Sequence, residues 1–145
     1  MSFGKLAALY GICAAVFFAL DLVWLTTAVP RLYQPALGVT GEKPPYLLLA
    51  KPNIGVAVAF YLLYVVGIVA LAVVPGIREG AVLGALWRGA LFGLIAYATY
   101  DLTNLATLAN WPVNITIIDM AWGLVLNSVV AVVGFYAGTK LLNLS

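Results

Sequence analysis

Four long apolar runs constrain this chain more than any other feature. They cover about residues 6–29, 54–74, 85–108 and 112–141. A helix needs about 20 apolar residues to cross the hydrocarbon core of a bilayer, and each run is long enough. The runs are continuous rather than alternating, which favours helices over the strands of a barrel. With 65% hydrophobic and 8% charged residues, the chain is typical of an all-α membrane protein with four transmembrane helices.

The connections between the runs predict an antiparallel bundle that forms a single domain over residues 1–145. Pro75 and Gly76 are expected to end the second helix, and a short loop up to Gly84 then leads into the third. One long loop joins the first two helices, and its aromatic and leucine residues suit the membrane interface. This loop is rich in proline and contains Pro30, Pro35, Pro44, Pro45 and Pro52, together with Tyr33 and Tyr46.

The basic residues divide almost evenly between the two faces of the predicted bundle. One face holds Lys5, Arg78, Arg88 and Lys140, and the other holds Arg31, Lys43 and Lys51. This small excess places both termini in the cytoplasm, since cytoplasmic loops of membrane proteins are richer in Lys and Arg. The net charge of +2 is small and scattered, so the sequence does not indicate nucleic-acid binding.

Three aspartates lie inside segments that otherwise read as lipid-soluble. Asp21, Asp101 and Asp119 belong to three different helices. At 1.5 Å rise per residue, all three lie about 10 to 12 Å below the same membrane face. Each costs about 2.5 to 3.5 kcal/mol to insert near a helix centre, and somewhat less at this depth. They are the candidate catalytic residues, because such groups usually mark functional positions.

The neighbours of these aspartates fit a shared pocket near the outer face. Tyr97 and Asn104 lie on the same helix stripe as Asp101, at helical spacing. Trp122 follows Asp119 by one turn, and Trp24 follows Asp21. Asn127 lies one to two turns deeper. The candidate ligand-pocket residues are therefore Tyr97, Asn104, Trp24, Trp122 and Asn127.

Structural interpretations of the same residues stay open. Asp101 and Asn104 are also typical of a hydrogen-bonded helix-packing pair. Asp21 has two basic candidates for an ion pair, Arg31 and Lys51. Trp24 also fits an aromatic belt at the membrane interface.

Metal and cofactor chemistry has little support in the sequence. The chain has no His, which removes imidazole-ligated haem, His-based zinc sites and His-based triads. The single Cys13 lies in an apolar run and is expected to be a small buried residue. Oxygen ligands at the aspartates suit a divalent cation, but no tight ligand motif supports one. We therefore expect no metal and no cofactor.

Two GxxxG patterns supply close helix packing. They are Gly89–Gly93 and Gly134–Gly138. Such patterns let helix backbones approach closely. We favour packing within the bundle, with a homodimer or a larger membrane partner as the alternative use.

Three sequence stretches resemble a known bacterial family. They are Phe60 to Gly67, Tyr97 to Thr107 with its Tyr-Asp-Leu-Thr-Asn run, and Asp119 to Gly123. On these the chain is similar to the small membrane proteins catalogued as domain of unknown function 2177. The resemblance covers nearly the whole chain and implies a four-helix bacterial membrane protein. We expect this multi-pass protein in the bacterial inner membrane. The resemblance brings no activity, substrate or cofactor.

Three functions compete at this stage. The first is a pocket that binds or modifies a lipid-like or other apolar small molecule, with one carboxylate as general acid and another as base. The second is a small proton- or cation-coupled transporter that acts as an oligomer. The third is a non-catalytic accessory subunit of a membrane complex. The sequence leaves open whether the protein is an enzyme.

Overall fold

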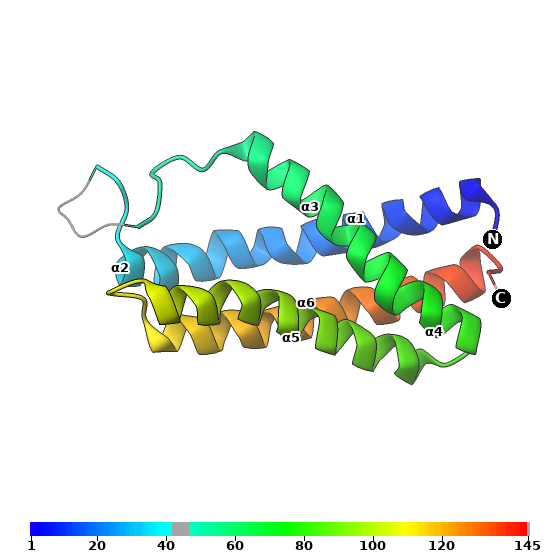
Figure 1. Ribbon diagram of the computed structural model, residues 1–145. Helices are drawn as coiled ribbons and strands as arrows, with labels where there is room; N and C mark the ends of the chain where they lie inside the picture. Colours follow the sequence, from blue (N-terminus) through cyan, green and yellow to red (C-terminus); the bar gives the residue numbers. More distant parts are fainter. Residues whose placement is uncertain (42–46, 145) are drawn as a thin grey trace.

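The computed structural model describes residues 1–41 and 47–144, and these form a bundle of long helices (Figure 1). The helices are α1 (Phe3–Ala28), α2 (Gln34–Leu37), α3 (Ile54–Ile68), α4 (Val74–Glu79), α5 (Val82–Thr107) and α6 (Val113–Tyr136), with π-helical turns η1 (Val29–Tyr33), η2 (Val69–Val73) and η3 (Ala137–Leu141). They combine into four segments long and apolar enough to cross a membrane: Phe3–Leu37, Ile54–Glu79, Val82–Thr107 and Val113–Leu141. The prediction of a four-helix membrane protein is confirmed.

The second span does not end at Pro75 and Gly76, so that predicted boundary is wrong. The π-helical turn η2 precedes this proline, and Pro75 occupies the first turn of α4. A proline lacks the N–H that an inner helical turn needs, but it is tolerated in a first turn. The helix instead ends at Gly80, whose φ of 64° is the left-handed conformation that glycine adopts readily. The connection to α5 is correspondingly shorter than predicted.

The first span also runs further than its predicted end at residue 29. It passes through Pro30 in η1 and continues through α2 to Leu37, before Gly38 turns the chain with a φ of 68°. The first part of the predicted loop is therefore helical. Four other residues assigned to that loop lie outside the described residues: Lys43, Pro44, Pro45 and Tyr46.

Glycines allow α5 and α6 to pack more closely than any other pair of elements. A side chain at Gly93 would collide with the carbonyl of Gly123 and with Asn127. A side chain at Gly89 would likewise collide with α6, and one at Gly134 would collide with Cys13 and Val73. Both GxxxG patterns thus contribute to contacts inside the bundle, where backbones approach without a Cβ between them. A partner that docks through these patterns remains a prediction.

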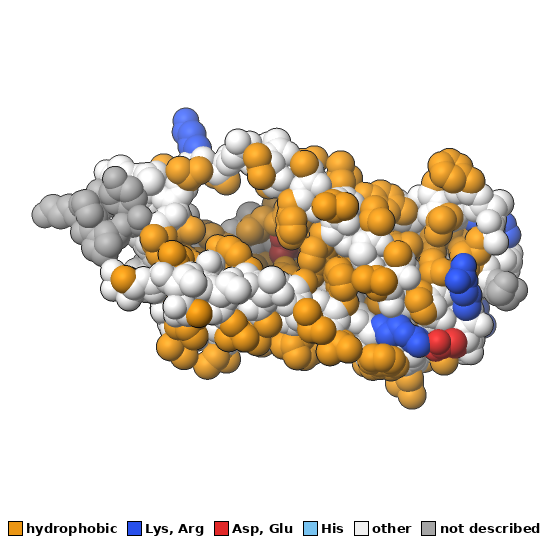
Figure 2. Space-filling view, in the orientation of Figure 1, with side chains coloured by type: hydrophobic (Ala, Val, Ile, Leu, Met, Phe, Trp, Pro, Cys, Tyr) orange, Lys and Arg blue, Asp and Glu red, His pale blue; other side chains and the backbone are white. Residues whose placement is uncertain are grey.

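The start of α3 leans away from the other spans, as Figure 1 shows. Its early residues are largely exposed: Ile54, Val56, Val58 and Phe60. The second span approaches α5 mainly through η2 and α4 rather than through α3. The space-filling view shows a hollow between α3 and α5, with an acidic side chain deep inside it (Figure 2).

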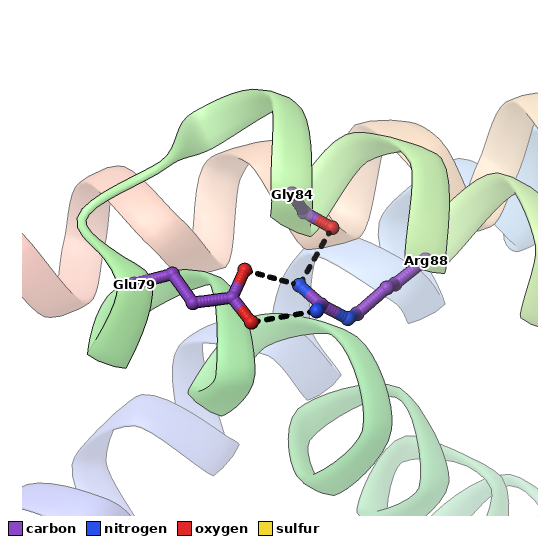
Figure 3. Close-up of polar contacts among 3 residues, drawn as sticks. All are labelled: Glu79, Gly84 and Arg88. Carbon is purple, nitrogen blue, oxygen red and sulfur yellow. Dashed lines mark hydrogen bonds and ion pairs between the residues drawn. The ribbon is translucent and has the colours of Figure 1, made fainter.

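The opposite end of the bundle carries both termini and an ion pair (Figures 1 and 3). Arg88 donates from its two terminal nitrogens to the two carboxylate oxygens of Glu79, at 2.7 and 2.6 Å. Lys5 donates to the backbone carbonyl of Asn143 at 3.3 Å and ties the two ends of the chain together. Both termini lie at one end, as an even number of crossings requires.

Candidate functional site

Asp101 and Asp119 face each other across the α5–α6 hairpin. Asp101 lies near the end of α5, and Asp119 lies near the start of α6. Because the two helices are antiparallel and closely packed, both residues fall at one level. Their carboxyl groups are close enough to influence each other electrostatically. A carboxylate has no proton to donate, so this contact becomes a hydrogen bond only when the two groups share a proton.

Asp101 is the most isolated member of this carboxyl pair. Its side chain is 0% exposed. Neither of its oxygens has a hydrogen-bond donor among the described residues. Among those residues the ion pair of Glu79 and Arg88 lies at the far end of the bundle, and no cationic side chain pairs with Asp101. Buried polar groups normally have partners, so Asp101 is an exception that needs an explanation.

Tyr33 holds the second member of the pair. Its hydroxyl donates to Oδ1 of Asp119 in a short hydrogen bond. Tyr33 reaches this position because α1 continues through the π-helical turn η1 beyond Pro30. A small hydrophobic cluster of Leu37, Trp111 and Ile115 packs the end of this span against the α5–α6 hairpin. The helical extension of the first span therefore positions a donor at the site.

Asp21 is held separately, by two donors from two other helices. The hydroxyl of Tyr61 on α3 donates to Oδ2 at 2.5 Å, and the indole nitrogen of Trp122 on α6 donates to Oδ1 at 3.2 Å. Asp21 is only 4% exposed. Among the described residues no ion pair joins Asp21 to Arg31 or Lys51, the two ion-pair candidates from the sequence.

The three aspartates do not meet at a single point. Among the described residues no three acidic, Cys or His side chains are arranged to hold one metal ion. Asp101 and Asp119 form a pair, and Asp21 stands beside it, joined to α6 through Trp122. The carboxyl groups are therefore arranged as a pair with a neighbouring carboxylate, and a pocket that all three share remains a prediction.

Aromatic rings enclose this carboxyl cluster, by which we mean Asp21, Asp101 and Asp119. Trp24 stacks on Trp122 with ring centres 4.5 Å apart and planes 3° from parallel. Tyr33 meets Trp24 edge-on at 6.3 Å. The two tryptophans thus line the site, and Trp24 is engaged with the site rather than standing alone in an interfacial belt.

A second polar level lies deeper in the bundle. Asn127 donates from Nδ2 to the carbonyl of Gly123 at 2.7 Å, while its Oδ1 has no donor among the described residues. The hydroxyl of Tyr64 is buried there and also lacks a partner. The Tyr97 ring packs on Gly123, and its centre is 6.5 Å from that of Tyr64. Asn127 in this polar level and the pair of Asp101 and Asp119 therefore lie along the same α5–α6 contact.

One predicted pocket residue stays outside the hydrogen-bonded cluster. Asn104 is half-buried, and among the described residues its side chain makes no hydrogen bond to a carboxyl group. The proposed packing pair of Asp101 and Asn104 is therefore not formed by a hydrogen bond. Asn104 shares the stripe of Asp101 on α5 but contributes no bond there.

Sequence reasoning missed the two tyrosines that bind the carboxylates. Tyr33 sits in a proline-rich stretch that reads as a loop, and Tyr61 sits in a lipid-facing run on a helix without an acidic residue. A signal for Tyr61 was present, because it belongs to the Phe60 to Gly67 stretch that carries the family resemblance. No spacing rule links Tyr33 or Tyr61 to an aspartate on another helix.

Comparison with known proteins places the chain among membrane proteins. A family model described as a predicted membrane protein, domain of unknown function 2177, matches residues 6–136 and confirms the resemblance seen in the sequence. No curated protein and no solved structure matches the chain. The matched segment contains every residue of the carboxyl cluster and both tyrosines that bind it.

Proposed function

We propose the function of this chain, which belongs to the predicted membrane protein family of domain of unknown function 2177, from its site alone. The protein binds or modifies a lipid-like or other apolar small molecule at the carboxyl cluster. The polar end of that molecule lies at the cluster, and its apolar part lies in the hollow between α3 and α5 (Figure 2).

The observation that carries this proposal is the unpartnered carboxyl group of Asp101. A buried polar group without a partner costs about 1 to 3 kcal/mol, and a charged one costs more. A position that only packed helices together would gain stability from an apolar residue instead. Residues that cost stability are characteristic of sites kept for function. Asp101, with Asp119 beside it, is therefore the proposed centre of the site.

The carboxyl pair suits acid–base chemistry on a bound molecule. Two carboxyl groups in contact can hold one proton between them, so that one is an acid and the other a base. Tyr33 fixes the orientation of Asp119, and the stacked rings of Trp24 and Trp122 stand beside the site. Asp21, bonded to Tyr61 and Trp122, orients the aromatic wall.

The location in the cell is proposed from the distribution of basic residues. We place the protein in a bacterial inner membrane with both termini cytoplasmic, on the basis of the Lys and Arg distribution. The carboxyl cluster then lies toward the outer face. A ligand from the outer leaflet would reach it through the hollow without crossing the apolar core formed by Leu9, Cys13 and Ile68.

The experiment compares molecules that co-purify with the wild type and with two variants. Asp119→Asn removes a carboxylate from the site, and Glu79→Gln removes one at the opposite end of the bundle as a matched control. Native mass spectrometry is applied to protein extracted in mild detergent. We expect a bound small molecule in the wild type and in Glu79→Gln but not in Asp119→Asn. Identical bound species in all three proteins would contradict the proposal.

One observation favours a second candidate, a proton- or cation-coupled transporter that acts as an oligomer. A carboxyl pair inside a membrane is the usual form of a proton site. The apolar core below the cluster closes the way to the other face in this structure, so transport requires another conformation or a second copy. Proteoliposomes loaded with a pH-sensitive dye test it: proton flux lost in Asp119→Asn would favour this candidate over binding alone.

A further inference from the structure

Three hydrogen-bond donors at the carboxyl cluster are already bonded to carboxylates, whereas the oxygens of one carboxyl group remain free acceptors. Tyr33 donates to Asp119, and Tyr61 and Trp122 donate to Asp21. Both oxygens of Asp101 are unpartnered. Asp101 therefore offers a ligand two acceptors, and a ligand that bonds to it must bring hydrogen-bond donors.

The negative charge of the cluster limits which polar head groups can bind there. Three carboxyl groups lie close together, and none has a Lys or Arg partner among the described residues, where the ion pair joins Glu79 to Arg88 at the other end. A charge inside a membrane is stable only when it is paired or hydrated. A phosphate or carboxylate head would add repulsion, whereas a cation would reduce it.

The aromatic walls favour a cation over a neutral donor. Trp24 and Trp122 form a stacked pair beside Asp21, and Tyr33 meets this pair edge-on. Indole faces attract cations, most strongly where water is excluded. An ammonium group also carries three N–H donors, while a hydroxyl group carries one. Carboxyl groups and indole rings together therefore recognise an amine better than an alcohol.

The route of entry suits a molecule that also has an apolar tail. The hollow opens sideways between α3 and α5 (Figure 2), and α3 carries exposed apolar side chains, among them Phe60. Of the carboxyl pair, Asp119 is the partly exposed member, and Asp101 lies fully buried beside it. A head group arriving from the bilayer would meet Asp119 first.

From these observations we infer that the molecule bound at the carboxyl cluster is an amphiphile with a protonated amine as its polar head and no phosphate. The inference rests on the proposed function, because it names the ligand class for that same site. The amine contacts Asp119, and the unpartnered Asp101 supplies the second negative group. The hydrocarbon tail of the ligand fills the hollow between α3 and α5.

The test uses three brominated probes with one alkyl chain and different heads: a primary amine, an alcohol and a phosphate. Bromine quenches tryptophan on contact, so Trp24 and Trp122 report arrival at the site. The protein carries Trp87→Phe and Trp111→Phe, because Trp87 is half exposed at the other end of the bundle and Trp111 packs in the separate cluster with Leu37 and Ile115. Trp24 and Trp122 are then the two tryptophans that remain. It is reconstituted in nanodiscs of phosphatidylcholine, which has no net charge. We expect saturable quenching by the amine at a concentration about tenfold lower than by the alcohol, as charge-assisted bonds are roughly twice as strong as neutral ones.

Variants and competing outcomes make the test decisive. Asp119→Asn should lose the preference for the amine, while Glu79→Gln, with the same change in net charge, should keep it. An alcohol or phosphate probe that saturates at an equal or lower concentration would overturn the amine assignment and leave the proposed function standing. An amine preference that survives in Asp119→Asn would also overturn it. If no head group gave saturable quenching, both the assignment and the proposed function would fail. The comparison of head groups leaves the carboxyl cluster unchanged, so it does not depend on the folding of Asp119→Asn.

Discussion

Replacing Asp101 by Asn should stabilise the protein, although it alters a fully buried residue. Asparagine has the same shape as aspartate, so packing on α5 is kept. The change removes a carboxyl group whose two oxygens lack donors and which lies beside Asp119. It also adds an amide that can donate to Asp119. We estimate a gain of about 1 to 3 kcal/mol, the free energy that an unsatisfied buried group costs.

The same substitution at Asp21 should have the opposite sign. Asp21 accepts from Tyr61 and Trp122, one bond on each oxygen. An asparagine oxygen can accept one of these bonds, but the amide nitrogen then faces the other donor. Hydrogen bonds to charged groups contribute about 1.5 to 3 kcal/mol, so Asp21→Asn should lose about that much. The comparison of the two variants tests whether hydrogen-bond donors to the carboxylate decide the sign of the stability change.

The assay is reversible unfolding by sodium dodecyl sulfate in mixed micelles, followed by the helical circular dichroism signal. The wild type, Asp101→Asn and Asp21→Asn are measured in one lipid-free preparation, so that no bound ligand stabilises the wild type. Our reasoning predicts midpoints in the order Asp101→Asn, wild type, Asp21→Asn, from highest to lowest. If Asp101→Asn lost as much stability as Asp21→Asn, Asp101 would be an ordinary packing residue and the reasoning would be refuted.

Three further predictions follow from individual contacts. Tyr61→Phe should destabilise the bundle by about 1 to 2 kcal/mol in the same assay, because Asp21 loses one donor; an unchanged midpoint would contradict that bond. Gly93→Ala should destabilise strongly, because its Cβ would enter the α6 backbone, whereas Gly11→Ala has open space around it and should gain about 0.5 to 1 kcal/mol; equal midpoints would disprove this packing. In intact cells a membrane-impermeant thiol reagent should label Asn110→Cys but not Ser2→Cys; the reverse pattern would invert the proposed orientation.

The fold could be predicted from the sequence because lipid imposes a simple rule. Each apolar run long enough to cross the membrane must be helical, since unpaired backbone groups are too costly there. The boundaries at Pro30 and Pro75 could not be predicted in the same way. Proline usually ends a helix. Here Pro30 lies within a π-helical turn and Pro75 directly follows one, and in both cases the helix continues. That compensation leaves no pattern in the residues.

The candidate site could be predicted only in outline. Depth along each helix can be counted from the sequence, because rise per residue is fixed, and it placed Asp21, Asp101 and Asp119 at one level. Depth says nothing about rotation or about which donor turns toward which carboxylate. Tyr33 reaches Asp119 only because the helix continues beyond Pro30, and Tyr61 on α3 reaches Asp21 on α1. Such contacts depend on helix packing, which one sequence does not specify.

The most direct measurement is an experimental structure of the protein in lipid nanodiscs, at a resolution that separates ordered water from a bound molecule. Our account predicts that the carboxyl groups of Asp101 and Asp119 face each other, with elongated density reaching Asp119 from the hollow between α3 and α5. Carboxyl groups turned apart, each bonded to an unrelated neighbour and with a hollow filled only by the surrounding bilayer, would contradict the account.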